Sequence, residues 1–176
     1  GGLPIVAFNS TVEGFTPDCY VGTDYTLSGR TAAGLLHMIA GRQRINLAIM
    51  AGASNMFSST TRIRGFLQEL DRLGADCHLV DTCKLFPDDE SSNDEYAYNL
   101  TTRMLSRHPE INAMFTVSGS AMNVAQAIAD QGRTGKIIHL AFDLNRDTIV
   151  PLQNGSITAV IGQDSFRQGY QPLKLL

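Results

Sequence analysis

Three polar side chains of complementary chemistry stand next to strongly apolar segments of this chain. Asp143 directly follows the apolar run 137–142, and Gln163 follows the run 157–161 after a single glycine. Arg62 stands early in a segment whose apolar residues recur with helical spacing. A guanidinium offers only hydrogen-bond donors, a carboxylate only acceptors and an amide both. Together they would suit a sugar, whose adjacent hydroxyls both donate and accept.

Each of these side chains also has a purely structural interpretation. Arg62 could be a solvated surface arginine, and Gln163 could simply end a strand. Asp143 could cap the following helix, although Asn145 competes for that role. A helix over 59–73 would place Arg62 in its first turn, where a cation opposes the helix dipole at a cost of about 0.3–1 kcal/mol. That cost favours an anionic neighbour such as Asp143, or a ligand.

Motifs for catalysis are poorly represented. Ser118 and Ser120 follow the apolar run 113–117, where they could cap a helix or contact a ligand. The segment lacks the Gly-x-Ser-x-Gly elbow of serine hydrolases. Cys83 also follows an apolar run, but no histidine stands where it would visibly activate the thiol. We therefore expect no enzyme, with a hydrolase that uses Ser120 or Cys83 as the weaker alternative.

The elements that must position these residues alternate along the chain. The pattern predicts strands over 5–8, 45–50, 77–82, 113–117, 137–142 and 157–161, and helices over 26–40, 59–73, 93–107, 120–131, 146–153 and from 165 onward. Strict alternation predicts an α/β fold, a doubly wound parallel sheet with right-handed crossovers. Ligands approach the carboxyl ends of such strands. Arg62, Ser118, Asp143 and Gln163 should therefore meet at one edge of the sheet.

The first strand is set apart from the others. The connection 9–24 is long and irregular, with a short extended piece at 20–24. We therefore expect the strand 5–8 to belong to a second lobe, outside the sheet formed by the five later strands.

Composition excludes several classes of protein. The chain has 176 residues, a formal net charge of −3 and a pI near 5.7, so it lacks the basic footprint of a nucleic-acid-binding domain. No apolar run approaches the roughly 20 residues that a membrane helix needs. The cysteines and histidines show no metal-ligand spacing. We expect neither a metal nor a cofactor.

The three cysteines bear on the redox environment. Cys77 and Cys83 bracket a predicted strand, and extended chain of that length spans roughly 20 Å. Disulfide-bonded Cα atoms lie only about 4.4–6.8 Å apart, so these two should not pair. Free thiols in odd number weakly favour a reducing compartment.

Several short motifs, in order along the chain, resemble the sugar-binding domain of LacI-type transcriptional regulators, which has the type 1 periplasmic binding protein fold. The segments that carry the resemblance are Leu3–Asn9, Val21–Asp24, Ser28–Ala32, Arg62–Phe66, Phe142–Asp143 and Gly155–Gln163. The resemblance implies two lobes with a sugar between them. It places the ligand-contacting arginine, aspartate and glutamine of the family at Arg62, Asp143 and Gln163. Asn9 stands where the family commonly has aspartate, and Ser118 where it usually has asparagine.

The resemblance also implies a division of the chain. Residues 1–24 would hold the last strand of an N-terminal lobe and the first crossover, 25–161 the C-terminal lobe, and 162–176 the crossover back and the start of a helix. The chain would be a fragment of a cytoplasmic regulator that responds to a sugar, dimerises and binds DNA through a domain absent here. The alternative is a periplasmic, extracellular or lipid-anchored sugar-binding protein of a transporter.

Overall fold

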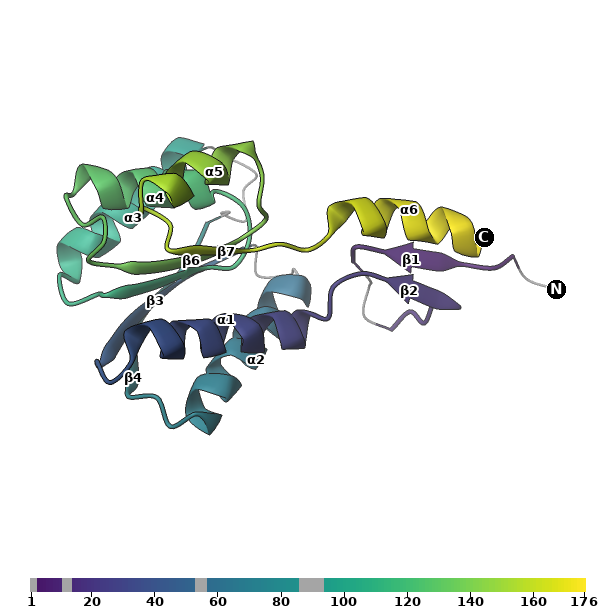
Figure 1. Ribbon diagram of the computed structural model, residues 1–176, viewed down its shortest axis with the longest axis horizontal. Coiled ribbons are helices and arrows are strands. Elements are labelled where there is room, and N and C mark those ends of the chain that lie inside the picture. Colours follow the sequence, from purple (N-terminus) through teal and green to yellow (C-terminus); the bar gives the residue numbers. More distant parts are fainter. Residues whose placement is uncertain (1–2, 11–13, 53–56, 86–93) are drawn as a thin grey trace.

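The computed structural model describes residues 3–10, 14–52, 57–85 and 94–176. The chain forms a larger part, in which helices cover both faces of a parallel sheet, and a smaller part to one side of it (Figure 1). The strands are β1 Val6–Phe8, β2 Cys19–Val21, β3 Ile45–Ala51, β4 Cys77–Lys84, β5 Ala113–Thr116, β6 Ile138–Phe142 and β7 Ala159–Ile161. The helices are α1 Tyr25–Ala40, α2 Phe57–Arg72, α3 Asp94–Arg107, α4 Ala121–Asp130, α5 Arg146–Gln153 and α6 Ser165–Leu175.

The larger part confirms the doubly wound parallel sheet. Its five strands are all parallel and lie in the order β4-β3-β5-β6-β7, so β4 lies on one side of β3 and the three later strands lie on the other. Helices α1 and α2 cover one face, and α3, α4 and α5 cover the other (Figure 1). The carboxyl ends of the strands therefore share one edge, as the alternation of elements predicts.

Strand β3 shows why the sheet is buried on both faces. Ile45, Leu47 and Ile49 pack into the core under α1 and α2, whereas Ala48 and Met50 pack under α3 and α4. Successive side chains of a strand point to opposite faces, so a continuously apolar strand requires a helix layer on each side. This requirement fixes the three-layer arrangement.

Helices α1 and α2 approach each other unusually closely. A Cβ atom on Gly29 would lie 2.1 Å from the main-chain oxygen of Arg62, and one on Gly65 would lie 2.4 Å from that of Thr26. Only glycine permits such contact between two backbones. The crossing places α2 so that Arg62 reaches the edge of the sheet.

The smaller part holds the first strand outside the five-stranded sheet, as expected, and adds a strand beside it. The extended piece predicted at 20–24 is strand β2, Cys19–Val21, and it pairs in parallel with β1, so the first strand has a partner within the chain. Helix α6 packs against both strands, far in sequence from them (Figure 1). Val6 and Ala7 of β1 are half-buried and Phe8 is 58% exposed, so this apolar strand is only partly covered in the described structure.

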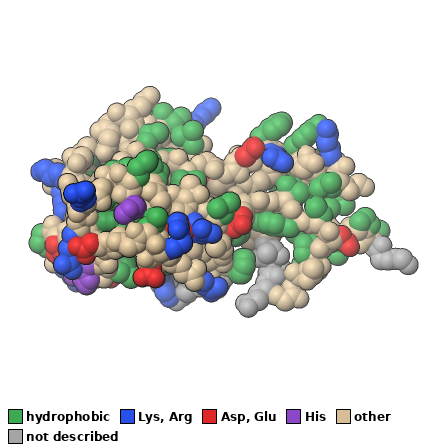
Figure 2. All heavy atoms as spheres, turned by 60° about the horizontal axis from the view of Figure 1, so that its bottom comes forward, with side chains coloured by type: hydrophobic (Ala, Val, Ile, Leu, Met, Phe, Trp, Pro, Cys, Tyr) green, Lys and Arg blue, Asp and Glu red, His purple; other side chains and the backbone are tan. Residues whose placement is uncertain are grey.

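None of the described helices is long and apolar enough to cross a membrane. On the face shown in Figure 2, acidic and basic side chains are interspersed over the larger part. That face therefore presents no extended field of one sign.

Candidate functional site

The structure brings Arg62, Gln163 and Asp143 into one hydrogen-bonded row at the carboxyl edge of the sheet. Nη2 of Arg62 donates to Oε1 of Gln163, and Nε2 of Gln163 donates to Oδ1 of Asp143. The three residues come from α2, from the connection after β7 and from the end of β6. The row thus joins three elements that are separated by up to 101 positions in sequence.

Arg62 is not a solvated surface arginine, because the residue is only 4% exposed. Its guanidinium carbon lies 4.0 Å from the ring centroid of Phe142 and 5.0 Å from that of Tyr25. Phe142 contacts Phe115, which stacks on Phe66, so the ring below Arg62 is part of the core. Burial lowers the pKa of Arg62, and the nearby Asp143 carboxylate opposes that shift.

The position of Arg62 in its helix differs from the prediction. Helix α2 begins at Phe57, so Arg62 lies in the second turn and the dipole argument for a partner does not apply. Arg62 and Asp143 are joined through Gln163, and the nearby carboxylate is favourable for another reason, the burial of the guanidinium.

A count of donors shows what Arg62 offers a ligand. Besides the bond to Gln163, Nε donates to Ser28 Oγ at 3.4 Å and Nη1 donates to the main-chain oxygen of Val117 at 3.1 Å. A guanidinium carries five N–H donors, so within the described residues two remain unused. A buried N–H without an acceptor costs free energy, and a ligand oxygen would remove that cost.

Asp143 is exposed and is not the cap of the following helix. Asn145 caps α5, accepting from the main-chain N–H groups of Asp147 and Thr148 in a capping box. Asp143 itself has a φ of +67°, in the left-handed region that few residues other than glycine adopt. Such a backbone is maintained only where the surroundings enforce it, and it turns the carboxylate toward Gln163.

Asn9 directly follows β1, and its main chain lies near the row of Arg62, Gln163 and Asp143. Its carbonyl oxygen accepts hydrogen bonds from the hydroxyls of Tyr25 and Tyr20, the latter at 2.9 Å. Because the ring of Tyr25 also lies beside Arg62, this residue connects Asn9 to the row. Burial, followed by the hydrogen bond with Tyr25, raises the pKa of Tyr20.

Ser118 lies next to Val117, whose carbonyl holds Arg62, but Ser118 does not join the row. Its hydroxyl oxygen is inaccessible and has no hydrogen-bond partner among the described residues. Ser120 occupies the N-cap position of α4, yet its side chain makes no capping hydrogen bond. The capping interpretation of this segment is therefore wrong for the Ser120 side chain.

Two of the hollows in the described part of the structure adjoin the Asp143 end of the row. One, of about 440 Å³, is lined by residues that include Asp143, Leu144, Gln163 and Phe166. The other, of about 130 Å³, includes Ser120 and Asp143. Ligand pockets typically enclose about 300–1,000 Å³, so the 440 Å³ hollow has a suitable size, and its wall carries two carboxylates, Asp143 and Asp164, and two amides, Asn145 and Gln163.

Neither cysteine chemistry nor a metal is supported by the described residues. The three cysteines are free, and burial, then the neighbouring Asp81, raises the pKa of Cys83 to about 11. A thiol with that pKa is protonated at neutral pH and is a poor nucleophile. In the part of the chain that the structure describes, no group of three or more His, Cys, Asp or Glu side chains could hold a metal ion.

Sequence reasoning missed the residues that hold the row in place. Tyr25 and Ser28 both contact Arg62 from α1. Thr23 Oγ1 donates to Oε1 of Gln163 at 3.3 Å. These residues are ordinary in type, and only the crossing of α1 over α2 reveals their role.

The parallel sheet, the second small sheet and the polar row at the edge agree with the type of fold that comparison with known proteins identifies. The chain belongs to the periplasmic binding protein domain family, whose profile matches residues 1–176. Among curated proteins, it is similar to the D-allose-binding periplasmic protein of Escherichia coli (strain K12), with 26% identity over 96% of this chain. The chain spans 52% of the length of that relative.

Solved structures agree on the fold. The XylFII–LytSN complex contains a chain that is 28% identical, with a TM-score of 0.88, over 99% of this chain and 62% of that one. A sugar ABC transporter (sugar-binding protein) from Bacillus halodurans is 20% identical, with a TM-score of 0.86, over 98% of this chain and 57% of that one. The second likeness concerns the fold alone. The LacI part of the predicted resemblance finds no support in these relatives.

Proposed function

We propose that this chain contributes half of the sugar-binding site of a substrate-binding protein that serves a transporter. The observation that carries the proposal is the buried Arg62, which has two N–H donors that no described residue uses, beside Gln163 and Asp143. A carboxylate with unused acceptor sites next to a guanidinium with unused donors suits neighbouring hydroxyls of a sugar. The name of the Escherichia coli relative supports the same ligand class.

Charge favours a neutral ligand. The guanidinium of Arg62 is already compensated by Asp143, and Gln163 between them adds no charge. An anionic ligand would place a second negative charge near Asp143, whereas a neutral sugar would exchange its hydration for hydrogen bonds. Arg62, Asp143 and Gln163 would bind the sugar directly, with Asn9 as a further contact. Ser118, which the sequence also suggested, has an inaccessible hydroxyl and would not contact the sugar in this arrangement.

The proposed division of the chain follows from the same placement. Residues 25–161 would form one lobe, and residues 1–24 and 162–176 would hold the crossovers and the elements of the other lobe. In this arrangement the hydroxyls of a sugar would be enclosed when the lobes close. The protein would act outside the cytoplasm, as a periplasmic, extracellular or lipid-anchored receptor.

The second candidate is the effector domain of a LacI-type regulator, a cytoplasmic dimer that binds DNA through another domain. The motif Arg62–Phe66 and the segment Gly155–Gln163 favour it as much as they favour a transport receptor, because the two classes share one fold. The Escherichia coli relative named above favours the receptor. Neither these motifs nor this relative supports an enzymatic function.

Two measurements test the proposal. Isothermal titration of the full-length protein with D-allose, D-ribose, D-xylose, D-glucose, D-galactose and D-arabinose should reveal binding of at least one sugar, and heat from none of them would refute the proposed site. The N-terminal sequence of the native protein then separates the candidates. A mature start after a removed export signal supports the receptor, whereas a helix-turn-helix would replace it with the regulator.

A further inference from the structure

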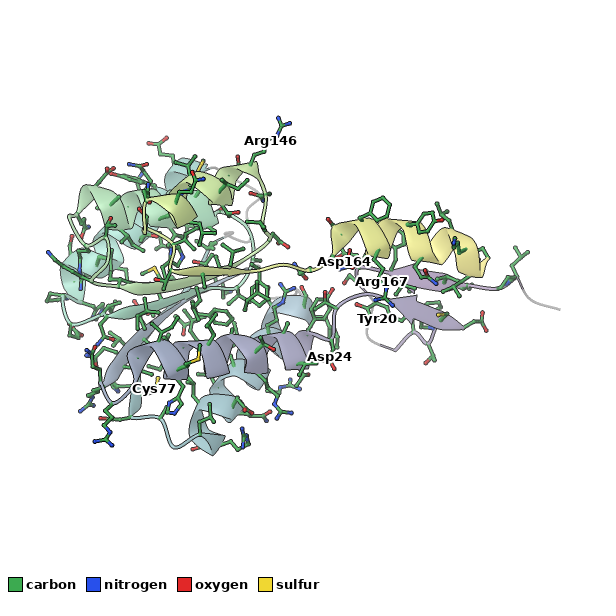
Figure 3. The ribbon with its side chains drawn as sticks, viewed as in Figure 1. Tyr20, Asp24, Cys77, Arg146, Asp164 and Arg167 are labelled. Atoms are coloured by element: carbon green, nitrogen blue, oxygen red, sulfur yellow. The ribbon has the colours of Figure 1, made fainter. Side chains whose placement is uncertain are left out.

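Two short connections join the smaller part of the molecule to the larger part. Residues 22–24 lead from β2 into α1, and residues 162–164 lead from β7 into α6. The labelled residues Asp24 and Asp164 mark the two connections at the narrow junction in Figure 3. If one part moves relative to the other, the backbone of these two connections must change conformation.

A buried amide on α6 ties the two connections together. Gln168 is 9% exposed, and its Nε2 donates to the hydroxyl of Thr23 at 3.3 Å and to the main-chain oxygen of Gln163. Thr23 in turn donates to the side-chain oxygen of Gln163 at 3.3 Å. The three residues thus form a closed set of hydrogen bonds, which we call the junction triad.

The junction triad determines how Gln163 faces the candidate site. Oε1 of Gln163 accepts from both Thr23 and Arg62, which uses its two lone pairs. The NH₂ group must then point toward Asp143, where it donates one hydrogen bond and keeps one hydrogen for a ligand. Reversing the amide would set NH₂ against the donor-only guanidinium of Arg62 and Oε1 against the carboxylate of Asp143, which only accepts, so the network permits a single orientation.

We propose that Gln168 is a positioning residue for the candidate sugar site, acting through Thr23 and Gln163 without contacting the ligand. The inference rests on the proposed function of that site. Gln168 fixes the main chain of the connection 162–164, and through Thr23 it fixes the Gln163 amide. Formation of the site and the mutual placement of the two connections are therefore coupled.

The test compares Gln168→Met with Gln171→Met in the full-length protein. Methionine preserves the length of the side chain but donates no hydrogen bond. Gln171 lines the same groove of about 630 Å³ between β2 and α6, one turn further along, and serves as the matched control. The probe is whichever of the six sugars named above binds the wild type most tightly. Gln168→Met should weaken it roughly five- to thirtyfold, because two hydrogen bonds no longer hold Gln163 in the orientation that binds the sugar, and Gln171→Met less than twofold.

Thr23→Val supplies a second, nearly isosteric variant. Because both side chains act through Gln163, the double variant Thr23→Val/Gln168→Met should lose less affinity than the product of the two single losses. The melting temperature of the ligand-free protein, measured in parallel, separates positioning from general stability. An equal loss for Gln168→Met and Gln171→Met, or strictly multiplicative losses in the double variant, would overturn the inference while leaving the sugar site standing. Absence of sugar binding by the wild type would overturn both.

Discussion

Replacing Gly29 by alanine should push α1 and α2 apart and weaken the site without touching any ligand-facing group. The added Cβ would lie 2.1 Å from the main-chain oxygen of Arg62 and 2.9 Å from the main-chain nitrogen of Phe66. Ordinary contact begins at 3.4 Å, so the helices must separate by 3.4 − 2.1 = 1.3 Å along that contact. Neither obstacle is a side chain that could rotate away.

The magnitude follows from two opposing effects. Overpacking in a core costs about 1–3 kcal/mol, and a clash between backbones falls at the upper end. Alanine regains about 1 kcal/mol over glycine through helix propensity. The net loss is about 2 kcal/mol, or roughly 4–8 °C in melting temperature for a protein of this size. Because α2 carries Arg62, sugar affinity should also fall, by roughly tenfold for each 1.4 kcal/mol of lost interaction.

Gly34→Ala is the matched control, since it lies on the same helix with nothing within 4 Å of its added Cβ. It should raise the stability of the protein by about 0.5–1 kcal/mol. Calorimetry measures the melting temperature of both variants, and titration measures their affinity for sugar. Equal melting temperatures for Gly29→Ala and Gly34→Ala would show that the close crossing of α1 and α2 is not needed.

Three further predictions concern pH, the ligand site and the extent of the chain. Burial lowers the pKa of His139 from 6.5 to about 4, against its hydrogen bond to the Ser156 carbonyl, so the folded state excludes the proton. Stability should therefore be full above pH 6.5 and fall by about 2 kcal/mol on going to pH 5; denaturant unfolding checks this, and a pH slope unchanged in His139→Gln would contradict it. Asp143→Asn should weaken sugar binding at least tenfold while the exposed control Asp71→Asn does not, and equal affinities in a titration would remove Asp143 from the site. The isolated chain 1–176 should bind sugar more weakly than the full-length protein, and micromolar affinity of the isolated chain would argue against a cleft shared between two lobes.

The sequence predicts the main sheet well because its signals are local. Continuous apolar runs such as 113–117 and 137–142 require burial on both faces, and the intervening helical spacing supplies the covering layers. From parallel strands alone it follows that residues after β6 and β7 share an edge. The proximity of Asp143 and Gln163 could therefore be predicted from the sequence.

The N-terminal strands show where local signals fail. Strand β2 has only three residues and pairs with β1 across a separation of 13 positions, so its apolar content is too small to distinguish it from a connection. The position of Arg62 was predicted, but its environment was not. Its burial results from the rings of Phe142 and Tyr25, which belong to two other elements.

By itself, the sequence determined the order of strands and helices, the parallel sheet and the edge at which Arg62, Asp143 and Gln163 gather, because each follows from patterns of a few adjacent residues. Only the tertiary structure decided how these groups are held. The glycine crossing of α1 and α2 and the junction triad depend on contacts between segments up to 145 positions apart. Such contacts arise from packing in three dimensions, which no local pattern of residue types encodes.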